Sequence, residues 1–314
     1  MKVLITGGAG FIGSHLAKRL VSAGHLVHII DNMSTGRATN VERIHNCIIQ
    51  EQPIEEAFSS ASWLKDIDII YHLAATVGVK LVVNEPIHTI ENNVAGTSAV
   101  LRAASAFKIP TLIASTSEVY GKSEKVPFKE DDDVMYGATI YNRWSYAMSK
   151  AIDEHLALAY HAKNDLPVVI TRFFNTVGPR QVGQYGMVIP RFIEAAKQGK
   201  PIVIYGDGKQ SRCFCHVEDT INALVNLLLG QDRHECYGRI FNIGSNEEVT
   251  ILQLAQRIIE LTKSKSKITY ESYDKAYGAK FDDLRRRIPD ISRIKKAINW
   301  KPTHNLDSIL RDLI

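Results

Sequence analysis

The chain has 314 residues, of which 45% are hydrophobic and 23% charged, and it carries a net charge of +4. This length can bury a large core and favours two lobes, whereas the composition excludes long disordered stretches. The basic residues are scattered apart from a run at 285–287, so we expect no nucleic-acid groove, while a site for an anionic substrate stays open.

The four cysteines stand at positions 47, 213, 215 and 236, with irregular spacing. We therefore expect reduced thiols and a cytoplasmic protein, without a signal peptide, a membrane span or a membrane partner. The run Cys213-Phe214-Cys215-His216 lacks two further ligands at a suitable spacing, so we expect buried apolar cysteines and no metal site.

The first thirty-one residues have the pattern of a dinucleotide-binding unit. Residues 2–6 form a short apolar run that predicts a buried strand, and the glycine-rich stretch 7–13 follows directly. Apolar residues then recur at helical spacing up to Gly24, and a second apolar run, 26–30, ends at Asp31. The order strand, glycine turn, helix, strand, acid indicates a cofactor site for NAD.

Each glycine of the turn has a physical role. Gly7 permits the tight turn, Gly10 lets backbone amides approach a pyrophosphate, and Gly13 lets the helix pack closely on the sheet. Asp31 can accept hydrogen bonds from an adenosine ribose and would repel a 2′-phosphate, which favours NAD over NADP. We expect this part of the cofactor site to comprise Gly7, Gly10, Phe11, Ile12, Gly13, Asp31 and Asn32.

Further apolar runs at 47–49, 67–73, 111–115, 168–174 and 238–244 alternate with helical segments. Such alternation predicts an α/β fold with a Rossmann-type, doubly wound parallel sheet. Ligands of these sheets bind beyond the carboxyl ends of the strands, so the residues that follow each run are the candidates for function.

Two positions after the run 67–73 are cofactor candidates. Ala74 is small and leaves room for a ribose or a pyrophosphate to pass. Asn93 opens an alanine-rich helix at 99–106, where it either caps the helix or hydrogen-bonds across strands to hold the site.

Two groups of polar residues are the candidates for catalysis, one at the end of a predicted strand and one on a predicted helix. Thr116, Ser117 and Glu118 end a buried strand and need partners, either backbone or substrate. Tyr146 and Lys150 are four positions apart and therefore share one face of a predicted helix. An ammonium near a phenol favours the phenolate, as would a positively charged nicotinamide, so we expect Tyr146 to act as a base near neutral pH.

With these motifs, the chain resembles the extended short-chain dehydrogenase/reductase family of nucleotide-sugar epimerases, dehydratases and decarboxylases. The resemblance covers essentially the whole chain and includes the runs 172–180, 205–208, 212–214 and 287–290. It implies that NAD is the cofactor, contacted also by Tyr146 and Lys150, and that Thr116 is the hydroxyl partner of Tyr146. Many relatives have an Asp after the third strand that contacts adenine; here Glu51 is the candidate substitute.

The same resemblance implies a UDP-sugar as the substrate and a homodimer built on the helices that contain residues 99–106 and 146–160. Arg212 and Arg287 would neutralise the diphosphate, and Asn175 would meet a phosphate or a sugar hydroxyl. The substrate residues implied are Asn175, Arg180, Arg191, Tyr205, Arg212 and Arg287.

In this family the sugar is first oxidised at C4 to a 4-keto intermediate, and the residues after Thr116 separate the reactions that follow. Dehydratases typically have Asp-Glu there, and the hydroxyl of Ser117 is a poor acid in place of that Asp. The run Thr-Ser-Glu-Val-Tyr-Gly resembles UDP-glucuronate decarboxylases, which we take as the leading hypothesis. A UDP-sugar 4-epimerase acting on UDP-glucose or UDP-glucuronate, a 4,6-dehydratase, and a non-catalytic NAD-binding sensor or scaffold remain alternatives.

We expect two lobes with a cleft between them. The NAD-binding domain would span residues 1–174, with a return segment at 214–244. Residues 175–213 and 245–314 would form a smaller nucleotide-sugar-binding lobe, with helices predicted at 251–261 and 294–300.

Overall fold

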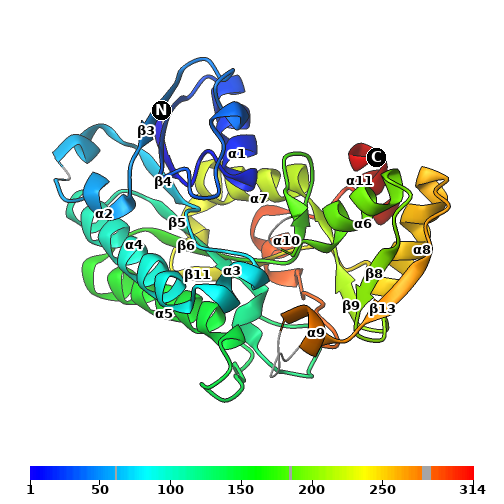
Figure 1. Cartoon of the computed structure of the whole chain (residues 1–314). Coiled ribbons are helices and arrows are strands. Elements are labelled where there is room, and N and C mark those ends of the chain that lie inside the picture. The colour runs from blue at the N-terminus through cyan, green and yellow to red at the C-terminus, as the bar shows by residue number, and fades with distance from the viewer. Residues whose placement is uncertain (61, 184–185, 278–283) are drawn as a thin grey trace.

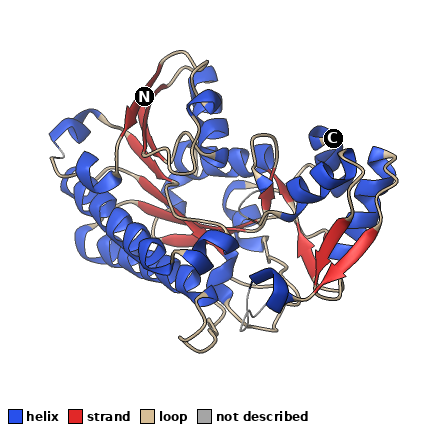
Figure 2. Cartoon of the chain, viewed as in Figure 1, coloured by secondary structure: helices blue, strands red, loops and turns tan. Residues whose placement is uncertain are grey.

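The computed structural model describes residues 1–60, 62–183, 186–277 and 284–314. A seven-stranded sheet lies at its centre, with the strand order β11-β6-β5-β4-β1-β2-β3 and every neighbouring pair parallel (Figure 2). The strands are β1 Lys2–Thr6, β2 Leu26–Asp31, β3 Cys47–Glu51, β4 Ile69–His72, β5 Thr111–Thr116, β6 Val168–Phe173 and β11 Arg239–Ile243. The predicted doubly wound parallel sheet is confirmed, and its strand order reverses between β1 and β4.

Helices cover both faces of the sheet (Figure 1). In β1, Val3 and Ile5 point into a core shared with α1 Phe11–Ser22 and α7 Val217–Leu229, whereas Leu4 points to the opposite core. That second core is closed by α4 Pro86–Phe107 and α5 Arg143–Asn164. Both faces of the strands are therefore buried, which explains their continuous apolar runs.

Helix α4 starts earlier than the alanine-rich segment suggested. It begins at Pro86, a residue that suits the first helical position because it has no amide hydrogen to leave unpaired. Asn93 consequently lies one-third of the way along the helix and does not cap it, so the capping alternative is wrong.

A smaller group of elements packs beside the sheet around its own apolar cluster, at the right of Figure 1. It contains the helices α6 Val188–Lys197, α8 Ile251–Thr262 and α11 Leu306–Leu313, and the parallel strands β8 Ile202–Tyr205 and β13 Ile268–Glu271. Thr250 caps α8 by accepting a hydrogen bond from the Gln253 amide, which confirms the predicted helix. The second predicted helix ends two residues early, because Asn299 adopts a left-handed conformation after α10 Ser292–Ile298.

Short elements complete the chain. The paired strands are β7 Thr176–Val177 with β10 Cys215–His216, and β9 Ser211–Cys213 with β12 Glu248–Thr250. The short helices are η1 Ala38–Asn40, α2 Ile54–Ala57, η2 Ser62–Asp66, α3 Val79–Asn84, η3 Ser117–Tyr120, η5 Arg233–Cys236 and α9 Tyr273–Tyr277.

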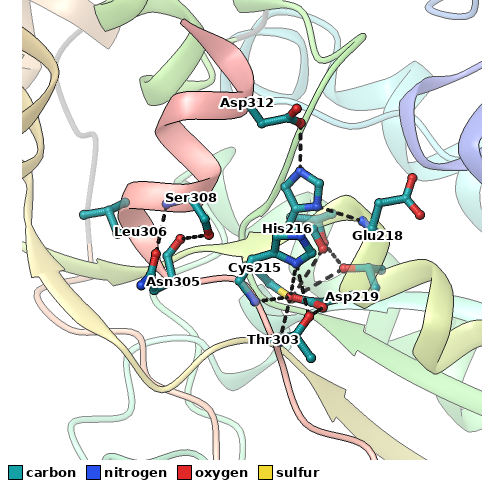
Figure 3. A network of polar contacts seen from close by, with 12 residues as sticks. Cys215, His216, Glu218, Asp219, Thr303, Asn305, Leu306, Ser308 and Asp312 are labelled. Atoms are coloured by element: carbon teal, nitrogen blue, oxygen red, sulfur yellow. Dashed lines mark hydrogen bonds and ion pairs between the residues drawn. The ribbon is translucent and has the colours of Figure 1, made fainter. Parts of the chain in front are cut away.

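A polar network fastens the C-terminal segment to α7 (Figure 3). The buried Asp219 carboxylate accepts hydrogen bonds from the Thr303 hydroxyl at 2.6 Å and from the His304 amide at 3.0 Å. The Nε2 atom of His216, at the start of α7, lies 3.1 Å from the Oδ2 atom of Asp312 in α11. These contacts join α7, which packs on the central sheet, to the C-terminal segment that packs in the smaller group of elements.

All four cysteines lie in the described ranges and are free, with the thiols of Cys213, Cys215 and Cys236 buried. Among the described residues, no set of three or more His, Cys, Asp or Glu side chains is arranged to hold a metal ion. In the same residues, no helix combines the length and the apolar character that crossing a membrane requires.

Candidate active site

The glycine turn after β1 leaves no room for side chains. A Cβ atom at Gly7, which has a φ of +71°, would lie 2.7 Å from the Ala74 amide nitrogen, and one at Gly13 would lie 2.2 Å from the Gly7 carbonyl oxygen. Gly10 precedes α1 without a side-chain cap, so the first amides of that helix stay open to a ligand. The turn therefore forms a cradle of backbone amides that fits a pyrophosphate.

Asp31 lies at the other end of this cradle, at the end of β2. Its two carboxylate oxygens accept hydrogen bonds from the amides of Ala9 and Met33, each at 2.9 Å. Burial raises the pKa of Asp31 above its ordinary value, and these amides oppose the rise. Asp31 lines a cavity of about 200 Å³.

The predicted cofactor residues gather at this cavity, with two exceptions. Lys150 and Asn93 lie behind its wall, where Asn93 accepts a hydrogen bond from the Thr76 amide at 2.8 Å and donates one to Ser149 at 3.2 Å. Gln52 lines the cavity, whereas Glu51 does not, and the adenine contact expected of Glu51 stays a prediction. The predicted residues that line it are Gly7, Gly10, Phe11, Ile12, Gly13, Asp31, Asn32, Ala74 and Tyr146.

A second cavity of about 360 Å³ adjoins the first, because Phe11, Ile12 and Tyr146 line both. It runs from the end of β5 to the smaller group of elements. The predicted residues on its wall are Thr116, Ser117, Glu118, Tyr146, Asn175, Arg191, Tyr205, Arg212 and Arg287.

Arg180 is the predicted substrate residue that lines neither cavity. It has a left-handed φ of 70°. Burial lowers the pKa of His15 on α1, and the Arg180 guanidinium adds to this effect, so Arg180 lies close to that helix. The substrate contact expected at Arg180 stays a prediction.

Only one arginine of the run 285–287 is buried. Arg285 and Arg286 form ion pairs with Asp207 and Glu248, at 3.2 Å and 2.8 Å, and their side chains are 78% and 54% exposed. Arg287 is 7% exposed and lies 3.5 Å from the Glu118 carboxylate in the larger cavity.

Glu118 has a second cationic neighbour that sequence reasoning missed. Arg143 donates a hydrogen bond from Nη1 to its carboxylate at 2.7 Å, and both side chains are buried or nearly so. Arg143 precedes Tyr146 by three positions in α5, so it lies on the same helical face. That spacing was the available signal, but the sequence held no motif that linked it to Glu118.

Tyr146 lies between Thr116 and the ionic cluster. Burial, helped by the Glu118 carboxylate, raises the pKa of Tyr146, while the Thr116 hydroxyl and the Arg287 guanidinium oppose the rise. The Lys150 ammonium, which is expected to favour the phenolate, forms an ion pair with Asp153 at 2.6 Å.

The far end of the larger cavity has an aromatic and cationic wall. The Arg191 guanidinium lies 4.0 Å from the centre of the Tyr205 ring, and Asn175 donates a hydrogen bond to the Cys213 carbonyl oxygen at 2.9 Å. Arg212 donates hydrogen bonds from Nη1 to the carbonyl oxygens of Ser211 and Leu284. Cationic and aromatic groups of this kind suit a nucleoside diphosphate.

Comparisons with known proteins agree with this geometry. The family model described as GDP-mannose 4,6 dehydratase matches residues 4–313. The chain is 44% identical to a UDP-N-acetyl-alpha-D-glucosaminuronate decarboxylase of Bacillus cytotoxicus, covering 100% of this chain and 96% of the relative. It is 36% identical to UDP-glucuronic acid decarboxylase 1 of Danio rerio, covering 100% and 72%.

Among solved structures, UDP-glucuronic acid 4-epimerase from Bacillus cereus, in complex with UDP-glucuronic acid and NAD, superposes with a TM-score of 0.88. It is 28% identical, and the match covers 99% of this chain and 97% of that one. With a family model that spans nearly every residue and a relative this similar over its whole length, the chain belongs to the GDP-mannose 4,6-dehydratase family, a group of extended short-chain dehydrogenases/reductases.

Proposed function

We propose that the protein is an NAD-dependent decarboxylase of a UDP-hexuronate, with UDP-glucuronate as the leading substrate and its 2-acetamido analogue as the next. The observation that carries this proposal is the cluster of Glu118, Arg143 and Arg287 at the end of β5, within the same cavity as Tyr146. The names of the relatives in B. cytotoxicus and D. rerio support it.

The cofactor half of the proposal is supported by the glycine cradle. The amides at the start of α1 would hold the pyrophosphate of NAD, and Asp31 would accept hydrogen bonds from its adenosine ribose. When bound, NAD supplies a hydride acceptor for the sugar C4 and later returns the hydride. The wall of the smaller cavity continues to Tyr146, so the nicotinamide end of the cofactor would lie beside the base.

Tyr146 would take the proton of the C4 hydroxyl. Burial raises the pKa of Tyr146, and the Thr116 hydroxyl opposes this rise. The hydroxyl can donate a hydrogen bond to the phenolate, while its oxygen accepts one from the Glu118 amide at 3.2 Å. The product of this step is a sugar with a ketone at C4 and a carboxylate at C6. The ketone is then β to the carboxylate.

Loss of carbon dioxide from such a sugar breaks the C5–C6 bond and moves its electron pair onto the C4 oxygen as an enolate. Arg287 would orient the carboxylate through a charge-assisted contact. Glu118 would take part in the transfer of the proton that C5 receives afterwards. Ser117 lies on the same wall and can hydrogen-bond the substrate. A 4,6-dehydratase would instead need an acid at Ser117, which makes that alternative weaker.

The 4-epimerase alternative is favoured by one specific observation, the close superposition with the B. cereus enzyme named for epimerisation of UDP-glucuronic acid. An epimerase keeps the C6 carboxylate, whereas a decarboxylase releases it. A sensor or scaffold has no use for Tyr146 and Thr116 as a proton-transfer pair, so we rank it last.

The test is incubation of the purified protein and NAD with UDP-glucuronate, its 2-acetamido analogue and UDP-glucose. Product mass and NMR would be recorded. We expect loss of one carbon dioxide from a uronate; a C4 epimer of unchanged mass would support the epimerase instead.

Three further features are part of the proposal. Residues 1–174 with 214–244 would bind NAD, and 175–213 with 245–314 would bind the nucleotide-sugar. The apolar clusters support this division in part, because Ile294 and Trp300 pack with the central sheet and Phe214 packs with the smaller group. A homodimer would form on α4 and α5, whose outer faces expose Ile87 and Ile152 at 71% and 49%. The four free thiols support a cytoplasmic location.

A further inference from the structure

Helix α5 carries a buried ion pair that the proposed reaction does not explain. Lys150 and Asp153 are 1% and 0% exposed, and the ammonium donates a hydrogen bond to the carboxylate at 2.6 Å. An ammonium withdrawn from water needs a counter-charge, since an unpaired buried charge is strongly destabilising. Asp153 supplies that charge one helical turn beyond the lysine.

The other groups that face this pair do not compete for the role. His72 on β4 lies between the hydroxyls of Thr6 and Thr97, at 2.7 Å and 3.0 Å. Burial, helped by the Lys150 ammonium, lowers the pKa of His72 to about 3, so the ring is neutral. Burial raises the pKa of Asp153, whereas the Lys150 ammonium and then Thr97 on α4 lower it.

Glu154, the next carboxylate on α5, is directed elsewhere. It pairs with Arg172 of β6 at 2.7 Å and accepts a hydrogen bond from Ser115 of β5. Among the described residues, Asp153 is therefore the carboxylate that faces Lys150.

The pair is connected to the base as well. Burial raises the pKa of Tyr146, and the carboxylates of Glu118 and Asp153 raise it further, whereas the Arg287 guanidinium lowers it. Asp153 thus opposes the effect of the neighbouring ammonium on the phenol. It lines neither cavity, so it reaches the substrate only through other residues.

We propose that Asp153 is a positioning residue: it holds the Lys150 ammonium one helical turn from Tyr146 and sets the pH at which Tyr146 gives up its proton. The catalytic consequence rests on the proposed function, whereas the ion pair itself does not.

The first test compares the pH dependence of kcat/KM for wild type and Asp153→Asn with the UDP-sugar that wild type converts. The variant keeps the size and a hydrogen-bond acceptor but removes the negative charge. Loss of that charge favours the Tyr146 phenolate, so the acid limb of the pH profile should move down by on the order of one pH unit. Asp165→Asn is the matched control, because it removes the same charge from the end of α5, where the side chain is 95% exposed, and should leave the limb in place.

If Asp153 had only a structural role, Asp153→Asn would lower kcat/KM at every pH without moving the acid limb of the pH profile. An acid limb of Asp153→Asn that coincides with wild type would overturn the inference while leaving the proposed function intact.

The second test is a stability cycle that needs no turnover. Thermal unfolding would be measured for Asp153→Asn, Lys150→Met and the double variant. Asp153→Asn leaves an ammonium buried without its carboxylate, whereas the double variant leaves neither charge, so its melting temperature should exceed that of Asp153→Asn. If Asp153→Asn fails to fold, recovery of folded protein in the double variant is the expected result.

Additive losses in the cycle, or a double variant that stays unfolded, would contradict the pairing. If wild type converts no UDP-sugar, the proposed function is wrong, and the cycle then decides on the ion pair independently.

Discussion

The Arg143 guanidinium donates a hydrogen bond to the Glu118 carboxylate at 2.7 Å, and this buried contact joins α5 to the end of β5. The two elements carry the base and the candidate acid of the proposed reaction. Their alignment is thus held by the same side chains that surround the sugar, which makes the charge on Glu118 the most informative one to remove.

Glu118→Gln should separate oxidation from carbon dioxide release. The amide cannot take part in proton transfer at C5, so decarboxylation should slow by about 10²-fold or more. Oxidation at C4 depends on Tyr146 and should continue, so reduced NAD should accumulate and be visible by its near-ultraviolet absorbance. Equal carbon dioxide release by the variant and wild type would show that Glu118 has only a structural role.

Tyr146→Phe should abolish nearly all turnover while NAD remains bound. The substitution removes the phenolic oxygen but none of the backbone amides of the glycine cradle, and loss of a general base typically costs about 10²–10⁴-fold. Turnover and NAD titration would be measured on the same preparation. Activity near that of wild type would mean that another group takes the C4 proton.

Arg287→Met should weaken binding of a uronate more than of UDP-glucose, because the neutral sugar has no carboxylate to pair with the guanidinium. A charge-assisted contact is worth about 1.5–3 kcal/mol, which corresponds to roughly 10- to 150-fold in affinity. Arg285→Met is the control, since the Arg285 side chain is 78% exposed and pairs with Asp207. If both variants behave alike towards the two sugars, Arg287 does not contact the carboxylate.

NAD affinity should fall at acidic pH through the protonation of Asp31. The ribose hydroxyls donate to the ionised carboxylate, and burial raises the pKa of Asp31, so the fall should begin above the range of an ordinary aspartate, about 3.9. Calorimetric titration of NAD and NADP across acidic pH would follow it. Asp31→Asn should lose this pH dependence and discriminate less against NADP; equal affinities of wild type for the two cofactors would contradict the assignment.

The parallel sheet, the glycine cradle and the position of Asp31 could be predicted from the sequence because each depends on local spacing. Apolar runs mark strands buried on both faces, and a turn without room for a Cβ atom requires glycine. Tyr146 and Lys150 could be placed on one helical face for the same reason.

Contacts between distant segments could not be predicted in this way. The pairing of Arg143 with Glu118 and the difference between Arg285 and Arg287 follow from how loops pack against the sheet, and no local pattern encodes them. Lys150 was expected to act on Tyr146, whereas its ammonium pairs with Asp153. This pairing could not be predicted, because it depends on side-chain directions inside a closed core. The left-handed backbone at Arg180 could not be predicted either, because this conformation is uncommon in residues other than glycine.

The measurement that tests the central claim most directly is carbon dioxide release from UDP-glucuronate, or its 2-acetamido analogue, labelled at C6. The assay uses purified wild type with NAD. The account predicts one labelled carbon dioxide for each UDP-sugar consumed and a UDP-pentose as the remaining product. Retention of the label in a UDP-hexuronate that differs only at C4 would contradict it.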